Sequence, residues 1–160
     1  MRLWVIRHAA AVRSSLLEDD ERPLSDLGRE QAGRLARYLR RRAAPDLLWS
    51  SPLLRARQTA EPIQAAFPSI PFHLVDALAP GNGTRQIIDE LRNGAAGECI
   101  LIGHEPLTSH LVSLLVSGDD ALRVRFAPAT VALVETPDPI RIGSALLLEC
   151  APPELLATLT

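Results

Sequence analysis

Two arginines and two histidines stand where a phosphoryl group could be bound and transferred. Arg7 and His8 directly follow a short apolar run, His104 follows a second such run, and Arg55 lies near the start of an expected helix. Phosphoryl transfer needs positive donors around the phosphoryl oxygens and a nucleophile in line with the leaving group. The guanidinium of arginine can donate two hydrogen bonds to the oxygens of one phosphate group. A neutral imidazole is a competent nucleophile when its other nitrogen is held as a hydrogen-bond donor.

Each of these residues also has a purely structural interpretation. Arg7 and His8 could be the exposed end of a strand, Arg55 a solvated helix arginine, and His104 a residue that begins a helix. The four together are far more specific than any one alone, because all of them stand at strand ends or in the first turn of a helix. They therefore form the candidate catalytic set.

Apolar runs that read as strands alternate with segments of helical periodicity. The expected strands lie at 3–6, 47–49, 72–75, 99–102, 130–135 and 144–150. Ser25 is a good cap for the first helix, which Pro45 closes and on which Leu27, Leu35 and Leu39 are expected to share one apolar face. Ser51 followed by proline predicts the start of the second helix, with the serine as its cap. Pro62 predicts a kink or restart near Glu61.

This alternation predicts an α/β fold, a three-layer α/β/α sandwich with a mostly parallel central sheet. Ligands in such folds gather at the carboxyl ends of the strands. Because Arg7-His8 and Gly103-His104 both lie at such ends, we expect a shared sheet edge to bring them together.

Composition narrows the class of protein. The chain has 160 residues, of which 47% are hydrophobic and 22% charged, with a net charge of −2. This suits one domain spanning residues 1–160 and argues against nucleic-acid binding, which needs a basic face. No apolar run approaches membrane-spanning length, and no targeting segment is evident. We therefore expect a cytoplasmic protein without a membrane partner.

The Arg-His, Ser-Pro-Leu and Gly-His signatures follow one another in this order along the chain. In this the chain resembles the histidine phosphatase superfamily, and within it the SixA-type phosphohistidine phosphatases. The resemblance runs over nearly the whole chain. The matching segments are Leu3-Trp4-Val5-Ile6-Arg7-His8-Ala9, Arg22-Pro23-Leu24-Ser25 through Gly28, Ser51-Pro52-Leu53-Leu54-Arg55-Ala56-Arg57-Gln58-Thr59-Ala60, Gly103-His104-Glu105-Pro106, Phe126-Ala127-Pro128-Ala129-Thr130 and Pro152-Pro153. Ala9 stands where the commoner signature has glycine, as it often does in the phosphohistidine branch.

The resemblance implies a role for each residue of the set. His8 would attack phosphorus and carry the phosphoryl group transiently, whereas Arg7, Arg55 and His104 would bind the phosphoryl oxygens. It also implies a phosphoglycerate-mutase-like fold and the absence of any metal or organic cofactor. The implied partner is a phosphorylated protein, such as a histidine-containing phosphotransfer domain, or a small phosphorylated substrate.

The general acid is the open question. Larger family members use a carboxylate between the second arginine and the second histidine, where this chain has Glu61, Asp76, Asp89, Glu90 and Glu98. Asp76 is the best-placed candidate, although a strand-end or turn aspartate is an equal interpretation. A phosphomonoester expels an alkoxide, which is a poor leaving group unless a proton donor assists it. A phosphohistidine expels an imidazole, which can leave neutral, so a site without a strong acid favours P–N bonds.

Two other functions compete with a protein phosphohistidine phosphatase. One is a phosphatase for small phosphomonoesters with Asp76 as the acid, and the other is a non-catalytic module that binds phosphate. His73 and His110 could join the other histidines in a metal site, but no ligand motif or closely paired carboxylates accompany them.

Overall fold

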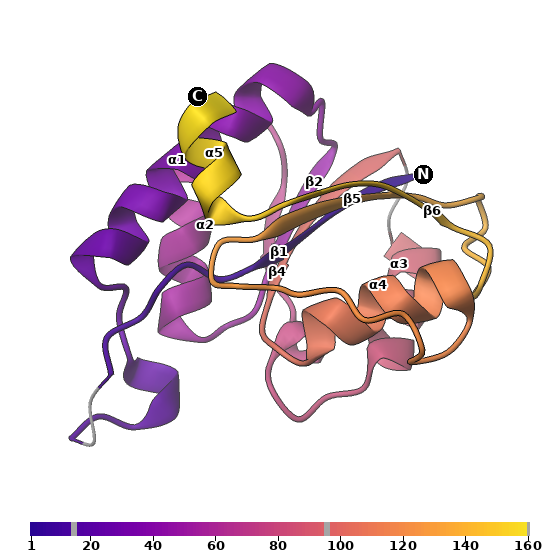
Figure 1. Cartoon of the computed structure of the whole chain (residues 1–160), viewed down its shortest axis with the longest axis horizontal. Helices are drawn as coiled ribbons and strands as arrows, with labels where there is room; N and C mark the ends of the chain where they lie inside the picture. Colours follow the sequence, from indigo (N-terminus) through magenta and orange to yellow (C-terminus); the bar gives the residue numbers. More distant parts are fainter. Residues whose placement is uncertain (14–15, 95–96, 160) are drawn as a thin grey trace.

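The computed structural model describes residues 1–13, 16–94 and 97–159, in which strands and helices alternate along most of the sequence (Figure 1). The strands are β1 (Arg2–Arg7), β2 (Leu47–Ser50), β3 (Phe72–Leu74), β4 (Glu98–Gly103), β5 (Val131–Glu135) and β6 (Leu146–Ala151). The helices are α1 (Asp26–Arg42), α2 (Leu54–Ala66), α3 (Thr84–Gly94), α4 (Leu107–Ser117) and α5 (Pro153–Leu159), with short 3-10 turns η1 (Asp19–Glu21) and η2 (Asp76–Leu78).

The six strands form one sheet in the order β3-β2-β4-β1-β5-β6. Strands β3, β2, β4 and β1 pair in parallel, whereas β5 is antiparallel to both β1 and β6. The expected mostly parallel α/β sheet is therefore confirmed. Its two central strands, β4 and β1, are the ones that end in the two histidine motifs.

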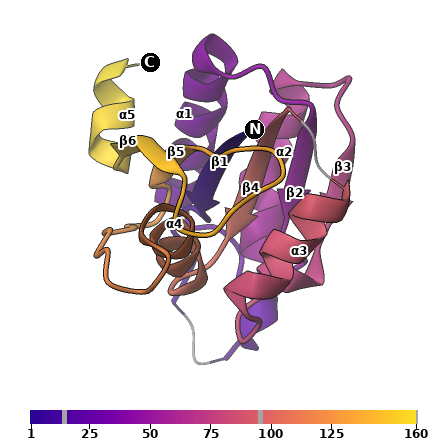
Figure 2. The ribbon, with the colours of Figure 1, turned by 90° about the vertical axis from the view of Figure 1, so that its right-hand side faces the viewer.

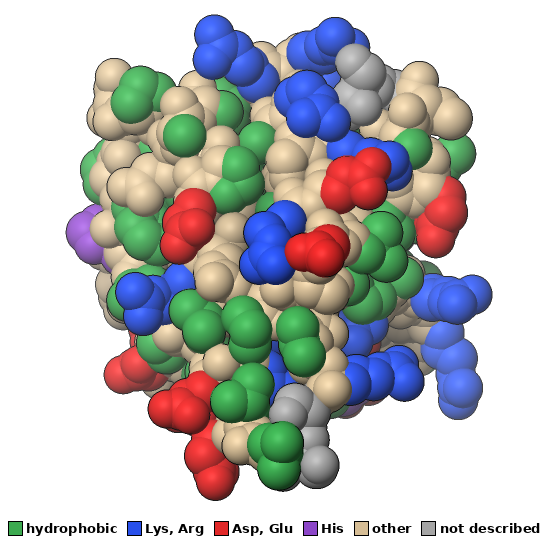
Figure 3. Space-filling view, turned by 90° about the vertical axis from the view of Figure 1, so that its left-hand side faces the viewer, with side chains coloured by type: hydrophobic (Ala, Val, Ile, Leu, Met, Phe, Trp, Pro, Cys, Tyr) green, Lys and Arg blue, Asp and Glu red, His purple; other side chains and the backbone are tan. Residues whose placement is uncertain are grey.

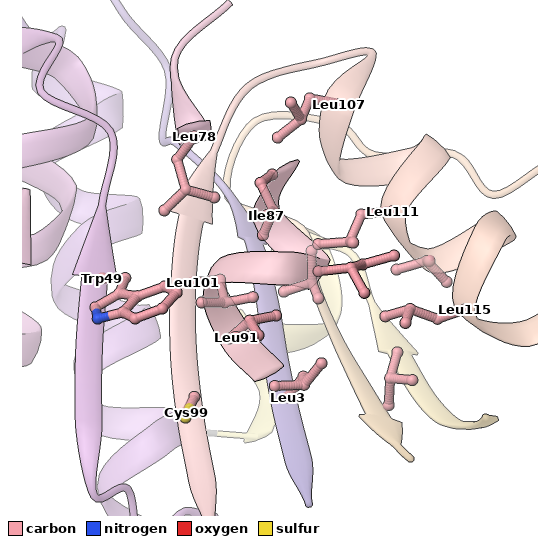
Figure 4. Close-up of a cluster of buried hydrophobic side chains, with 14 of the residues drawn as sticks. Leu3, Trp49, Leu78, Ile87, Leu91, Cys99, Leu101, Leu107, Leu111 and Leu115 are labelled. Atoms are coloured by element: carbon pink, nitrogen blue, oxygen red, sulfur yellow. The ribbon is translucent and has the colours of Figure 1, made fainter. Parts of the chain in front are cut away.

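Both faces of the sheet are covered, which explains why β1 reads as a continuous apolar run. Successive side chains of a strand point to opposite faces. Leu3 and Val5 pack with α3 and α4, whereas Trp4 and Ile6 pack with α1, α2 and α5. Figure 2 shows the sheet between these layers, and Figure 4 shows the α3 and α4 side of the core around Leu3.

The first helix begins as the sequence predicts but differs in one contact. The Ser25 hydroxyl accepts a hydrogen bond from the Gly28 backbone N–H at 3.1 Å, so it caps α1. Gly28 lies so close to the loop after β1 that an added Cβ would be 1.9 Å from the Ala10 carbonyl oxygen. Leu27, in the same turn, is exposed, because the face of α1 that meets the sheet is formed by Ala32, Leu35 and other residues.

The second helix differs from the sequence prediction at Pro62. A kink or restart is expected near Glu61, and the structure excludes the restart, because α2 continues through the proline. Ala60 and Ile63 are completely buried on either side of it. Tertiary packing of this kind supplies most of the stability of helices in proteins, and it here outweighs the loss of one backbone hydrogen bond.

On the side of the molecule that carries α1, arginines and carboxylates are interspersed (Figure 3). Two ion pairs within the helix, Arg29 with Asp26 and Arg34 with Glu30, contribute to this mixture. Among the described helices, none combines the length and the apolar character that crossing a membrane requires.

Candidate active site

The ends of the two central strands bring His8 and His104 together. In the parallel pairing of β1 with β4, the last residues of the two strands, Arg7 and Gly103, lie opposite each other. His8 and His104 directly follow them. The His8 backbone N–H donates to the Gly103 carbonyl oxygen at 2.9 Å. The two imidazole rings are 4.9 Å apart between centroids, and both side chains are buried.

The segment between β2 and α2 brings Ser51 and Arg55 to the same place. The Ser51 backbone N–H donates to the Ile102 carbonyl oxygen at 2.9 Å, next to the His104 motif. The helix begins at Leu54, so Ser51 stands too early to cap it, and the expected capping role is wrong. Its hydroxyl instead lies 2.8 Å from His104 Nε2, a role in the site that the sequence reasoning misses.

Hydrogen bonds place the ring proton of His8 on Nδ1. That nitrogen lies 2.7 Å from the Ala9 carbonyl oxygen, which can only accept, so Nδ1 is the donor. Nε2 keeps its lone pair and accepts a hydrogen bond from Arg55 Nε at 3.2 Å. Burial lowers the pKa of His8 to about 4, and the neighbouring arginines act in the same direction. His8 is therefore a neutral imidazole near pH 7, with a lone pair on Nε2.

His104 is also held neutral. Burial, followed by the proximity of His8 and Arg55, lowers its pKa to about 3. The Ser51 hydroxyl accepts a hydrogen bond from the Leu53 backbone N–H at 3.3 Å and can either donate to His104 Nε2 or accept from it. The other ring nitrogen of His104, Nδ1, is buried and bonds to no described residue.

Arg7 also has a buried donor without a partner among the described residues, at the end of β1. Its Nη1 donates to the Phe126 carbonyl oxygen at 2.6 Å, whereas its buried Nε bonds to no described residue. Burial lowers the pKa of Arg7, and the charge of Glu105 acts in the opposite direction. An arginine stays protonated at any physiological pH, so Arg7 brings a fixed positive charge to the cluster.

The loop that carries His8 is fixed by side chains that the sequence reasoning does not identify. Thr59, one turn after Arg55 on α2, accepts a hydrogen bond from the Ala9 backbone N–H at 3.1 Å and donates to the Arg55 carbonyl oxygen at 2.7 Å. Gln31 of α1 accepts from the Ala10 backbone N–H at 2.9 Å. Both side chains hold the backbone that follows the histidine, so they orient its ring relative to Arg55.

A carboxylate absent from the sequence prediction, Asp19, contacts the cluster. Its Oδ2 accepts from Arg55 Nη2 at 2.9 Å, its backbone carbonyl accepts from Arg55 Nη1, and its Oδ1 accepts from Arg22 Nε at 3.0 Å. Partial desolvation raises the pKa of Asp19, but the hydrogen bonds from Arg55 and Arg22 outweigh it and lower that pKa overall. Asp19 is therefore an ionised acceptor. Acidic residues in a polar loop are common, so its sequence context carries no signal of this contact.

The other sequence candidates lie apart from this cluster. Asp76 is exposed at the start of η2, and within the described ranges no hydrogen bond or ion pair joins its side chain to the four candidate residues. Arg57 is exposed on α2, pointing away from the position of Arg55. His73 and His110 are exposed on β3 and α4. In the parts of the chain that the structure describes, no three His, Cys, Asp or Glu side chains are grouped to hold a metal ion.

Known proteins resemble this chain in sequence and in fold. Residues 3–80 match the model of a family described as the histidine phosphatase superfamily (branch 1). An uncharacterized protein of Mycobacterium tuberculosis strain H37Rv is 31% identical over 121 residues, which cover 72% of this chain and 74% of that protein. The 5''-phosphoribostamycin phosphatase of Niallia circulans is 40% identical over 80 residues, 45% of this chain but only 37% of that protein.

Among solved structures, the protein histidine phosphatase SixA complexed with tungstate superposes over 98% of this chain and 99% of its own, with a TM-score of 0.85 and 23% identity. This similarity establishes the fold.

Proposed function

The chain belongs to the histidine phosphatase superfamily, and we propose that within it the chain is a protein phosphohistidine phosphatase with His8 as its nucleophile. The observation that carries this proposal is the state of His8. Its Nδ1 donates to the Ala9 carbonyl oxygen, and its Nε2 lone pair faces Arg55 in a buried site. A histidine in this state can attack phosphorus without first losing a proton.

In the first step, Nε2 of His8 bonds to phosphorus while the P–N bond of the substrate breaks. The bonding electrons leave with the substrate imidazole, which departs neutral when its distal nitrogen already carries a proton. As Nε2 bonds to phosphorus, its hydrogen bond from Arg55 Nε breaks, and that N–H turns to a phosphoryl oxygen. The buried Nε of Arg7 is a second donor, and Nδ1 of His104 is a third when it carries the ring proton. These donors supply the electrostatic stabilisation that such a transfer needs, so the proposal requires no metal ion.

In the second step, water attacks phosphorus, and the bond between phosphorus and His8 Nε2 breaks. Nδ1 keeps its proton, which it donates in the hydrogen bond to the Ala9 carbonyl oxygen, so the phosphorylated ring is cationic. When the bond to phosphorus breaks, His8 is released as a neutral imidazole. The same hydrogen bond therefore makes His8 a good nucleophile in the first step and a good leaving group in the second. Inorganic phosphate is the product.

The carboxylates support P–N rather than P–O substrates. Asp19 contacts the cluster, but two arginines hold it ionised, which makes it a poor proton donor. Glu105 follows His104, but its carboxylate accepts hydrogen bonds from Thr108 and Ser109 at the start of α4. Neither of these two carboxylates is free to protonate a leaving group, whereas an imidazole that already carries a distal proton needs no donor.

A small phosphomonoester is the second candidate substrate, favoured by the similarity to a phosphatase of phosphoribostamycin over 80 residues. Such a substrate would need an acid, for which Asp76 is the sequence candidate. Asp76 would have to approach the site on binding, since no hydrogen bond or ion pair joins its side chain to the four residues within the described ranges.

Rates across a series of substrates separate the two functions. Purified protein is assayed on a phosphohistidine-containing protein, phosphoramidate, aryl phosphates of graded phenol acidity and sugar phosphates. We expect rapid cleavage of P–N bonds, a steep dependence on phenol acidity and almost no hydrolysis of alkyl phosphates. Fast alkyl phosphate hydrolysis would refute the phosphohistidine assignment. Phosphate binding without turnover of any substrate would identify a non-catalytic module.

A further inference from the structure

Every donor nitrogen of Arg55 is engaged. Nε donates to His8 Nε2, whereas Nη1 and Nη2 donate to the carbonyl and carboxylate oxygens of Asp19. The Arg55 side chain is only 4% exposed, but that of Asp19 is 61% exposed. An exposed aspartate thus accepts a hydrogen bond from each of the two Nη nitrogens of a buried arginine.

Asp19 also lies where it opposes the binding of an anion. A phosphoryl group transferred to His8 Nε2 must come into contact with the guanidinium that donates to that atom. Its oxygens carry negative charge and compete for the same guanidinium, of which the Asp19 carboxylate holds Nη2. Two anions that share one guanidinium repel each other, so binding of either weakens binding of the other.

We propose that Asp19 is an internal competitor of the phosphoryl group for Arg55 and thereby sets the affinity of the site for phosphorylated substrate and for product phosphate. This inference rests on the proposed function, because it takes the cluster of His8 and Arg55 as the phosphoryl site. It assigns Asp19 an influence on affinity that operates through Arg55, so Asp19 is a positioning residue.

The surroundings of Asp19 allow it to yield to an incoming anion. It belongs to the turn η1, in which no residue is buried, so its displacement breaks no core packing. Arg22 also holds Oδ1, at 3.0 Å from Nε, and can keep the carboxylate nearby while Arg55 changes partner. When phosphate leaves, Asp19 returns to Arg55, which favours release of the product.

The neighbouring Asp20 provides a matched control. It lies on the same turn, is exposed, and carries the same charge, but no hydrogen bond or ion pair joins it to Arg55 among the described residues. Asp20→Asn therefore removes one negative charge from η1 without releasing Arg55. Asp19→Asn removes the same charge and weakens the hold on the guanidinium.

The experiment measures the dissociation constant of inorganic phosphate by calorimetry, and its inhibition constant in turnover, for the wild type and each variant. We expect Asp19→Asn to tighten phosphate binding on the order of tenfold, as for loss of a unit charge beside an anion at a partly exposed site. KM for the phosphorylated substrate should fall with it, whereas Asp20→Asn should change both constants less than about twofold. Circular dichroism checks that each variant is folded. If the fold of Asp19→Asn is altered, Asp19→Ala takes its place and should show the same tightening of phosphate binding.

Arg55→Ala separates this inference from the proposed function. If that variant loses phosphate binding while Asp19→Asn binds phosphate no more tightly than the wild type, the role of Asp19 is refuted and the phosphoryl site stands. Equal tightening in Asp19→Asn and Asp20→Asn would also refute it, because the effect would then be one of general charge. If Arg55→Ala binds phosphate normally, the phosphoryl site itself is wrong, and the role of Asp19 with it.

Discussion

Acidification should destabilise this protein through its two buried imidazoles. The pKa of His8 is lowered to about 4 and that of His104 to about 3, in each case chiefly by burial. In the unfolded chain both would titrate near pH 6.5. As the pH falls below about 6.5, the unfolded state binds protons before the folded state does, so the free energy of unfolding decreases. The stabilisation by the neutral rings is complete above that pH and is lost by the time the folded pKa is reached.

The size of the effect follows from these two pKa values. Between pH 7 and pH 5, an imidazole that titrates near 6.5 when unfolded and near 4 when folded lowers the free energy of unfolding by about 2 kcal/mol. His104 contributes a similar amount, since it too remains almost unprotonated in the folded protein at pH 5. Together they remove about 4 kcal/mol, a large part of the ~5–15 kcal/mol by which small domains are stable.

Urea unfolding at pH 7 and pH 5 measures this loss for the wild type and for His104→Ala. The variant is less stable at pH 7, but the difference from the wild type should shrink by about 2 kcal/mol at pH 5, because one titrating group is gone. His73→Ala is the control for the loss of a histidine outside the site, since His73 is exposed on β3. A wild type whose stability is unchanged at pH 5, or parallel pH dependences for His104→Ala and the wild type, would contradict buried neutral imidazoles.

Three further predictions test individual contacts. Arg55→Ala should lower kcat/KM by about 10² or more, the usual cost of losing a donor aimed at transition-state charge, whereas Arg57→Ala, at an exposed position two residues on, should have little effect. Gly28→Ala should lower the Tm and destabilise the protein by about 1–3 kcal/mol, because its Cβ would meet a backbone oxygen at 1.9 Å; Gly33→Ala, in the same helix with room for a Cβ, should not. Asp76→Asn should leave phosphoramidate hydrolysis and the leaving-group dependence unchanged, and a collapse of alkyl phosphate hydrolysis in that variant would instead identify Asp76 as an acid.

The parts of the fold that depend on periodicity could be predicted from the sequence. The apolar runs that end at Arg7 and at Gly103 predict buried parallel strands, and the structure pairs those strands directly. The meeting of His8 and His104 follows from the same rule, since the ends of adjacent parallel strands lie at one edge. Periodicity shows which elements are buried, and strand ends show where their motifs gather.

Contacts that depend on where a chain turns could not be predicted in this way. Ser51 has the sequence of a helix cap, but α2 begins three residues later, which frees the hydroxyl for His104. Asp19 lies in an acidic loop 36 positions before Arg55, and only the folded path of that loop places its carboxylate on the guanidinium. Leu27 fits an apolar stripe yet is exposed, because the exact rotation of a helix against a sheet is set by packing.

The identity of the phosphorylated intermediate is the most direct test of the proposed reaction. The enzyme is mixed with a protein carrying a ³²P-labelled phosphohistidine, quenched under alkaline conditions within the first turnover and digested, and the labelled position is located by mass spectrometry and NMR. We expect label on Nε2 of His8, because Nδ1 is committed to the Ala9 carbonyl oxygen, and no label or turnover in His8→Ala. Label on another residue, label on Nδ1, or turnover retained in His8→Ala would contradict the proposed mechanism.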